Sequence, residues 1–162
     1  MGERQDGGAQ AGGTLRVISD VVTFLATAEQ TGGAFALYSS ETPPGAGVPP
    51  HRHAGVSEVC LVLAGEYTFL VGEALVRATA GDSVRIPAGV VHAFTNTGRA
   101  PGRLLVAAGP GGRFEQFCRA VGAPAGAGQG PPAAGPGEVA RLIAAAADYG
   151  IEILPPAGAS HS

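Results

Sequence analysis

Residues 45–65, GAGVPPHRHAGVSEVCLVLAG, hold two histidines one residue apart and a glutamate five residues after the second. Side chains at positions i and i+2 of an extended strand point to the same face. His51 and His53 therefore share a face, and Arg52 points away from it. The prolines next to them favour an extended chain. Glu58 can join the two imidazoles if the chain bends between His53 and Glu58.

The segment that starts at Glu58 raises the question of how its charge is neutralised. Residues 58–64 are apolar on both of their alternating faces, which predicts a strand that is buried on both sides. An unpaired carboxylate in such a strand is very costly. A divalent cation would neutralise it, and so would one of the ten arginines of this lysine-free chain. The histidine pair by itself also fits solvated or hydrogen-bonded imidazoles.

A second segment, GDSVRIPAGVVHAFTN at residues 81–96, supplies a third histidine, His92. A turn of glycine and proline before it would aim its imidazole inward. Three neutral imidazoles and one carboxylate can hold a first-row divalent metal octahedrally and leave two positions open. Open positions are typical of catalytic metal sites. The fourth histidine, His161, falls in the C-terminal tail, where we expect it to be solvated.

The pattern of the whole chain predicts an all-β fold with a helical addition. Short extended runs broken by glycine or proline are typical of a β-sandwich or barrel. We expect a flexible tail over 1–13, a β-barrel over 14–112, and an extension over 113–162 with a Gly/Ala/Pro linker at 122–137. Two helices, one after residue 112 and one over 138–149, have apolar faces that predict packing on the outside of the barrel. The first face is formed by Phe114, Phe117, Cys118 and Val121.

Composition excludes several functions. The net charge of −3 without a basic stripe argues against nucleic acid as a partner. No apolar run reaches the roughly 18 residues of a membrane span, and the N-terminus has no secretory signal. We therefore expect a cytoplasmic protein that does not bind membranes. Cys60 and Cys118 fit no disulfide framework and are interpreted as small buried hydrophobic side chains.

The spacing of these residues resembles the two sequence motifs of the cupin superfamily. The first has Gly45, His51, His53, Glu58 and Gly65 in the pattern G-x5-H-x-H-x4-E-x6-G. The second runs G-x5-P-x-G-x2-H-x3-N and is matched by Gly81, Pro87, Gly89, His92 and Asn96. The resemblance implies a double-stranded β-helix, a small jelly-roll barrel. It also implies that His51, His53, Glu58 and His92 are metal ligands.

A looser resemblance points to a reaction class. Residues 107–125, AAGPGGRFEQFCRAVGAPA, are similar to the stretch after the barrel in bacterial quercetin 2,3-dioxygenase-like cupins. It implies a dioxygenase that acts with O₂ on a small aromatic or enolisable substrate. One ion of Fe(II), Mn(II), Ni(II), Co(II) or Zn(II) would be bound, with Glu58 as the catalytic base. The alternatives are a non-oxidative metal-dependent cupin (polyketide cyclase, isomerase or lyase) and a non-catalytic cupin that binds a small ligand.

Further residues are candidates for the substrate pocket, with core packing or a surface salt bridge as the alternative for each. They are Tyr38, Tyr67, Phe69, Arg85 and Phe94. Residues 15–27 could pair with a second copy through a strand edge, so we expect a homodimer.

Overall fold

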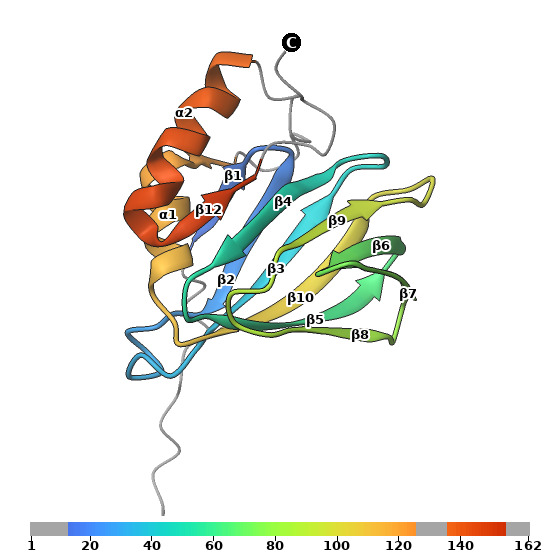
Figure 1. Cartoon of the computed structure of the whole chain (residues 1–162), viewed down its shortest axis with the longest axis horizontal. Helices are drawn as coiled ribbons and strands as arrows, with labels where there is room; N and C mark the ends of the chain where they lie inside the picture. Colours follow the sequence, from blue (N-terminus) through green and yellow to red (C-terminus); the bar gives the residue numbers. More distant parts are fainter. Residues whose placement is uncertain (1–12, 126–135, 155–162) are drawn as a thin grey trace, which may run out of the picture.

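A computed structural model describes residues 13–125 and 136–154 as two antiparallel β-sheets with two helices at one side (Figure 1). The seven-stranded sheet has the order β11 (Ala123–Pro124), β1 (Thr14–Val17), β2 (Asp20–Ala26), β3 (Ala36–Thr42), β10 (Gly102–Gly109), β5 (Ser57–Ala64) and β8 (Ser83–Ile86). The five-stranded sheet has the order β12 (Ile151–Ile153), β4 (Gly47–His53), β9 (His92–Asn96), β6 (Glu66–Val71) and β7 (Ala74–Thr79). The helical elements are α1 (Arg113–Val121), α2 (Pro136–Ala146) and the short 3₁₀ helix η1 (Ala147–Tyr149).

The predicted all-β class with two helices is confirmed. The sequence expectations for most of the N-terminal tail, for the middle of the linker and for His161 lie outside the described residues. Where the linker is described, it begins as β11, which pairs with β1. Residues 15–27 form β1, β2 and the turn between them, so they are strands of the barrel. β1 is paired with β11 on one side and β2 on the other, so it has no free edge.

Alternation along the strands builds the core between the two sheets. Phe24, Phe69 and Leu104 point inward and are completely buried. Tyr67, Phe69 and Phe94 pack against one another with ring centroids 5.8 to 6.0 Å apart. Burial of such aromatic side chains is the main stabilising contribution that a small barrel can obtain.

The strand that carries Glu58 differs from the expectation in one respect. Glu58, Cys60 and Val62 are buried, but Val59 and Leu63 on the other face are 42% and 40% exposed. The prediction that both faces are buried was therefore wrong. Both helices lie beside β1 and β12 instead of over β5, so the outer face of β5 is left to solvent (Figure 1). Antiparallel sheets commonly expose one face in this way.

The C-terminal segment contributes two helices that pack on the barrel and strands that join its sheets. α1 buries Phe117 and Cys118, and α2 buries Leu142 and Ala146. After η1, Gly150 adopts a left-handed φ of 70°, as expected after a helix. Gly122 instead has a φ of −73°, because the chain leaves α1 directly into β11.

β12 then pairs with β4 and covers an edge that would otherwise expose unpaired backbone groups. The sheets of the expected barrel, residues 14–112, therefore gain two strands from the C-terminal extension, β11 and β12. None of the described helices is long and apolar enough to cross a membrane.

Packing of α2 on the barrel can be tested by truncating one side chain. Leu142 is 2% exposed, so Leu142→Ala should lower the free energy of unfolding by about 2–5 kcal/mol. Val139 on the same helix is 39% exposed, and Val139→Ala should change the free energy of unfolding by less than about 0.5 kcal/mol. Urea denaturation of both variants measures this difference. Equal small effects would mean that α2 does not pack as described.

Candidate metal centre

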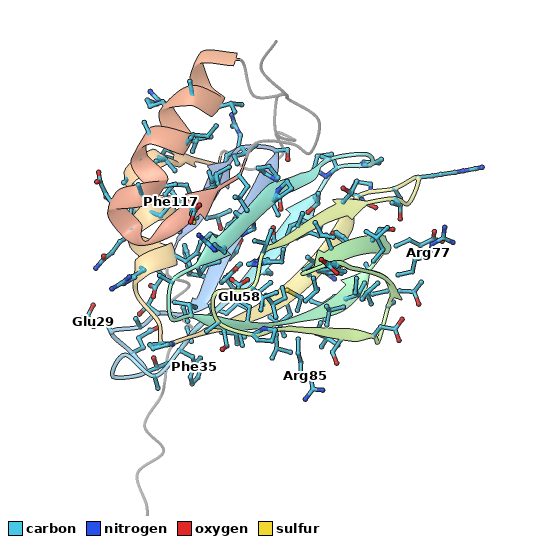
Figure 2. All side chains as sticks on the ribbon, in the orientation of Figure 1. Glu29, Phe35, Glu58, Arg77, Arg85 and Phe117 are labelled. Carbon is cyan, nitrogen blue, oxygen red and sulfur yellow. The ribbon has the colours of Figure 1, made fainter. Side chains whose placement is uncertain are left out.

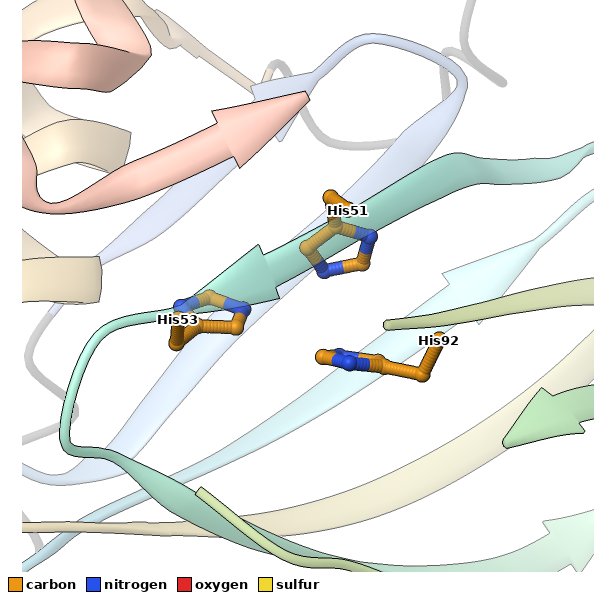
Figure 3. A group of neighbouring side chains, drawn as sticks. All are labelled: His51, His53 and His92. Atoms are coloured by element: carbon orange, nitrogen blue, oxygen red, sulfur yellow. The ribbon is translucent and has the colours of Figure 1, made fainter. Parts of the chain in front are cut away.

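Three histidines from two neighbouring strands meet inside the barrel (Figure 3). His51 and His53 lie on β4, and His92 is the first residue of β9. The register pairs His51 directly with His92. One ligand nitrogen from each ring lies within 4.8 Å of those of the other two. Arg52, between the first two, points outward to Glu152 at 2.6 Å, as the strand alternation predicts.

Backbone carbonyl groups orient two of the three rings. Nδ1 of His51 lies 2.8 Å from the Pro49 carbonyl oxygen, and Nδ1 of His92 lies 2.9 Å from that of Val90. A carbonyl oxygen only accepts, so each Nδ1 carries the proton. In the neutral imidazole, Nε2 then presents a lone pair. Histidines that bind metals are commonly held by such a bond on the other ring nitrogen.

The chain brings Glu58 to the histidines from the opposite sheet. Gly55 adopts a φ of 72° in the turn between β4 and β5, a conformation that favours glycine. Figure 2 shows Glu58 between the two sheets. Its Oε2 lies 2.9 Å from Nε2 of His92, and its Oε1 lies 3.7 Å from Nε2 of His53. The hydroxyl of Tyr38 donates to Oε1 at 3.5 Å.

The contact between Glu58 and His92 leaves the ring nitrogen without a hydrogen bond. Although the distance is short, Nε2 of His92 is a buried atom with no partner in hydrogen-bond geometry. The oxygen therefore lies too far from the direction of a ring N–H. The three imidazole nitrogens lie within 4.8 Å of one another, and the Glu58 carboxylate lies beside two of these rings, a donor set that suits a metal ion.

The pKa values of the four groups reflect this shared burial. Burial and the neighbouring His92 and His53 lower the pKa of His51 to about 4, and burial also lowers that of His53. Burial alone would raise the pKa of Glu58, but the adjacent histidines outweigh it and lower the value to about 2. Burial lowers the pKa of His92, whereas Glu58 raises it, with a net rise.

At neutral pH the site therefore offers at least two neutral imidazoles and an ionised carboxylate. Either a proton on His92 or a metal cation can neutralise that carboxylate. A set of imidazole nitrogens and a carboxylate suits a first-row divalent cation. The residues present thus fit a metal centre.

An internal cavity opens from the histidines. Its size is about 90 Å³, on a scale where one water molecule needs about 10–15 Å³. Its walls are mainly apolar and include Tyr38, Phe94, Phe114 and Phe117. A mainly apolar cavity with a few polar groups is typical of a small-molecule site.

The structure separates the five residues predicted for the pocket into three groups. Tyr38 and Phe94 line the cavity. Tyr67 and Phe69 are buried in the aromatic core and are not part of the cavity wall. Arg85 is exposed and projects away from the barrel (Figure 2), because Val84 and Ile86 take the inward positions of β8.

Several lining residues were not predicted from the sequence. Phe114 and Phe117 were interpreted as core packing; they do pack against the core, but they also close one side of the cavity. Asp20 and Ser40 line the cavity as well. The alternation Asp20, Val22, Phe24 carried a signal for Asp20, since its neighbours on that face are apolar core residues.

Cys60 also lines the cavity. It is 3% exposed, and burial together with the nearby Glu58 raises the pKa of its thiol. The thiol therefore stays protonated and unreactive. This agrees with its interpretation as a small buried hydrophobic side chain.

Comparisons with known proteins agree with this fold. A sequence model described as "Cupin domain" matches residues 39–108, which include all four residues of the site. No curated protein sequence matches the chain significantly.

Several solved structures are similar to the fold of this chain. A predicted oxalate decarboxylase from Thermotoga maritima is 25% identical, with a TM-score of 0.56 over 60% of this chain and 91% of that one. A recombinant oxalate oxidase in complex with glycolate is 26% identical, with a TM-score of 0.50 over 58% of this chain and 52% of that one. KdgF from a Halomonas species, at 14% identity, shares the fold alone, with a TM-score of 0.54 over 59% and 84%.

Removal of single imidazoles tests the metal centre. Loss of an outer partner of a ligand commonly reduces metal affinity about 10- to 100-fold. We therefore expect His53→Ala and His92→Ala to lower the affinity for Zn(II) or Fe(II) by more than about 100-fold. His161→Ala changes the fourth histidine of the sequence and is the matched control; it should bind like the wild type, because His161 is not among the proposed ligands. Metal content after dialysis measures this, and unchanged content in the first two variants would contradict the site.

Proposed function

Because this chain carries a cupin domain and belongs to the cupin superfamily, we propose that it is a metal-dependent dioxygenase. Its substrate would be a small aromatic or enolisable molecule. The observation that carries the proposal is the buried Nε2 of His92, which lacks a hydrogen bond although the Glu58 carboxylate lies 2.9 Å away, at a mainly apolar cavity. A cavity of this kind suits an apolar ring, and a buried unpaired nitrogen suits a cation.

His51, His53, Glu58 and His92 would hold the metal ion. When bound, a redox-active divalent ion supplies an activating site for O₂ and for an oxygen of the substrate. The remaining chemistry rests on the side chains of the cavity. Phe94 and Phe114 line the cavity and would exclude water from the substrate.

Glu58 would accept the proton of the substrate hydroxyl. With its pKa lowered to about 2, it is ionised at neutral pH, so its carboxylate can accept a hydrogen bond from that hydroxyl. Tyr38 donates to Oε1 and packs on Phe114, with ring centroids 4.8 Å apart. This places the tyrosine between the carboxylate and the apolar wall, where it would position Glu58.

Oxygen uptake tests the reaction class. Protein loaded separately with Fe(II), Mn(II), Ni(II) or Co(II) should consume O₂ in the presence of flavonols or smaller enols. Metal-stripped protein and His53→Ala should not, because each lacks a complete centre. An oxygen electrode gives the rate, and liquid chromatography identifies the cleaved product. Metal-loaded protein that consumes no O₂ with any of them, or that converts them without O₂, would contradict the dioxygenase proposal.

The positioning role of Tyr38 has its own test. A hydrogen bond to a charged group is worth about 1.5–3 kcal/mol, and at 3.5 Å this one belongs at the lower end. Tyr38→Phe should therefore lower kcat about tenfold while KM and metal content stay near the wild-type values. Tyr149→Phe is the matched control, because Tyr149 packs on Phe117 away from the carboxylate. An unchanged kcat in Tyr38→Phe would remove this residue from the mechanism.

A further inference from the structure

A second polar site faces the cavity of the metal centre. Asp20 is 4% exposed and lies among the residues that line the cavity. Its Oδ2 accepts hydrogen bonds from the hydroxyls of Ser40 at 2.6 Å and Thr42 at 2.9 Å. Ser19 donates to Oδ1 at 3.3 Å. The carboxylate is thus fixed by hydroxyl groups in an otherwise apolar wall.

Strand geometry separates this site from the histidines. Tyr38 and Ser40 lie on the same inward face of β3. Tyr38 contacts Glu58 of the metal centre, whereas Ser40 contacts Asp20. Each residue of a strand advances by about 3.4 Å, so the backbones of Tyr38 and Ser40 are about 7 Å apart along β3. The cavity therefore has two polar positions, Glu58 with the histidines and Asp20, reached from successive inward positions of β3.

No positive charge lies between these positions. None of the described residues that line the cavity is arginine or lysine. Burial raises the pKa of Asp20, and the hydroxyls of Ser40 and Thr42 lower it only in part. A carboxylate has about four acceptor positions, and three hydroxyls occupy three of them here. One acceptor position is left for a donor from a ligand.

We propose that Asp20 is a specificity residue that accepts a hydrogen bond from a hydroxyl of the substrate, at the end remote from the metal centre. This inference rests on the proposed function and narrows its substrate class to a hydroxylated aromatic molecule, with one oxygen at the metal and a hydroxyl across the ring. A hydroxyl supplies the missing donor without bringing a further charge into a mainly apolar cavity.

The same geometry disfavours a dicarboxylate. Two of the similar structures are described as a predicted oxalate decarboxylase and an oxalate oxidase. In this chain a second carboxylate would meet Asp20 and apolar walls without an arginine to neutralise it. It would have to take up a proton to bind, which weakens the affinity.

Three rigid probes test the inference: benzoate, 4-hydroxybenzoate and terephthalate. They share one carboxylate for the metal and carry, at the far end, no group, a hydroxyl or a second carboxylate. Calorimetric titration of the full chain loaded with Zn(II), which does not react with O₂, measures binding without turnover. The variants are Asp20→Asn and, as the matched control, Asp82→Asn. Asp82 is an exposed aspartate that accepts hydrogen bonds from Thr79 outside the cavity.

The wild type and Asp82→Asn should bind 4-hydroxybenzoate at least tenfold more tightly than benzoate, and terephthalate more weakly than benzoate. In Asp20→Asn the preference for 4-hydroxybenzoate over benzoate should fall below about threefold, because a hydrogen bond to a neutral acceptor is about half as strong as one to a carboxylate. Terephthalate should then bind at least as well as benzoate, since the amide can donate to it.

Two results would overturn the inference. One is a wild type that binds 4-hydroxybenzoate and benzoate within threefold of each other, a comparison that does not depend on any variant being folded. The other is an Asp20→Asn variant that keeps both wild-type preferences. Zinc content of the same samples separates the two proposals. Zinc-loaded protein without the preference rejects the role of Asp20 alone, whereas protein that holds no zinc contradicts the metal centre and the inference with it.

Discussion

The arrangement of this barrel depends on one electrostatic constraint: a buried carboxylate must be neutralised. Glu58 is 6% exposed and sits on the inner face of β5. An isolated charge there would cost more than the fold gains from any single apolar contact. Burial lowers the pKa of His51 and His53, whereas that of His92 is raised by Glu58. The site is therefore balanced only with a cation, whether a proton on His92 or a metal ion.

Strand pairing makes this balance possible. The pairing of β4 with β9 sets His51 opposite His92, and the N–H of Gly89 donates to the carbonyl of His53 at 3.1 Å. This bond ties the turn before His92 to the end of β4. On the other side β12 pairs with β4 along the histidine pair. β12, although it follows the predicted barrel in the sequence, thus pairs with the strand that carries His51 and His53.

Strand alternation correctly predicted the face of the strand to which a side chain points. It was less reliable in predicting whether that face is buried. It placed His51 and His53 on one face and Arg52 on the other, as the structure has them. It also predicted that β5 is buried on both sides, because Val59, Leu61 and Leu63 are apolar. Apolar side chains occur on exposed surfaces too. Whether a second layer covers a sheet face depends on where the helices pack, and that is a property of the whole chain.

The sequence by itself determined the β-rich class, the two C-terminal helices and the grouping of His51, His53 and His92. The first two follow from local periodicity, and the grouping of the histidines is what the resemblance of the two motifs to those of cupins implies. Only the tertiary structure decided which side chains share the cavity. Asp20, Phe114 and Ile151 come from distant parts of the chain and line it together, while Arg85 projects into solvent. The physical reason is that a cavity forms between sheets and helices, so its lining depends on contacts that no single strand pattern records.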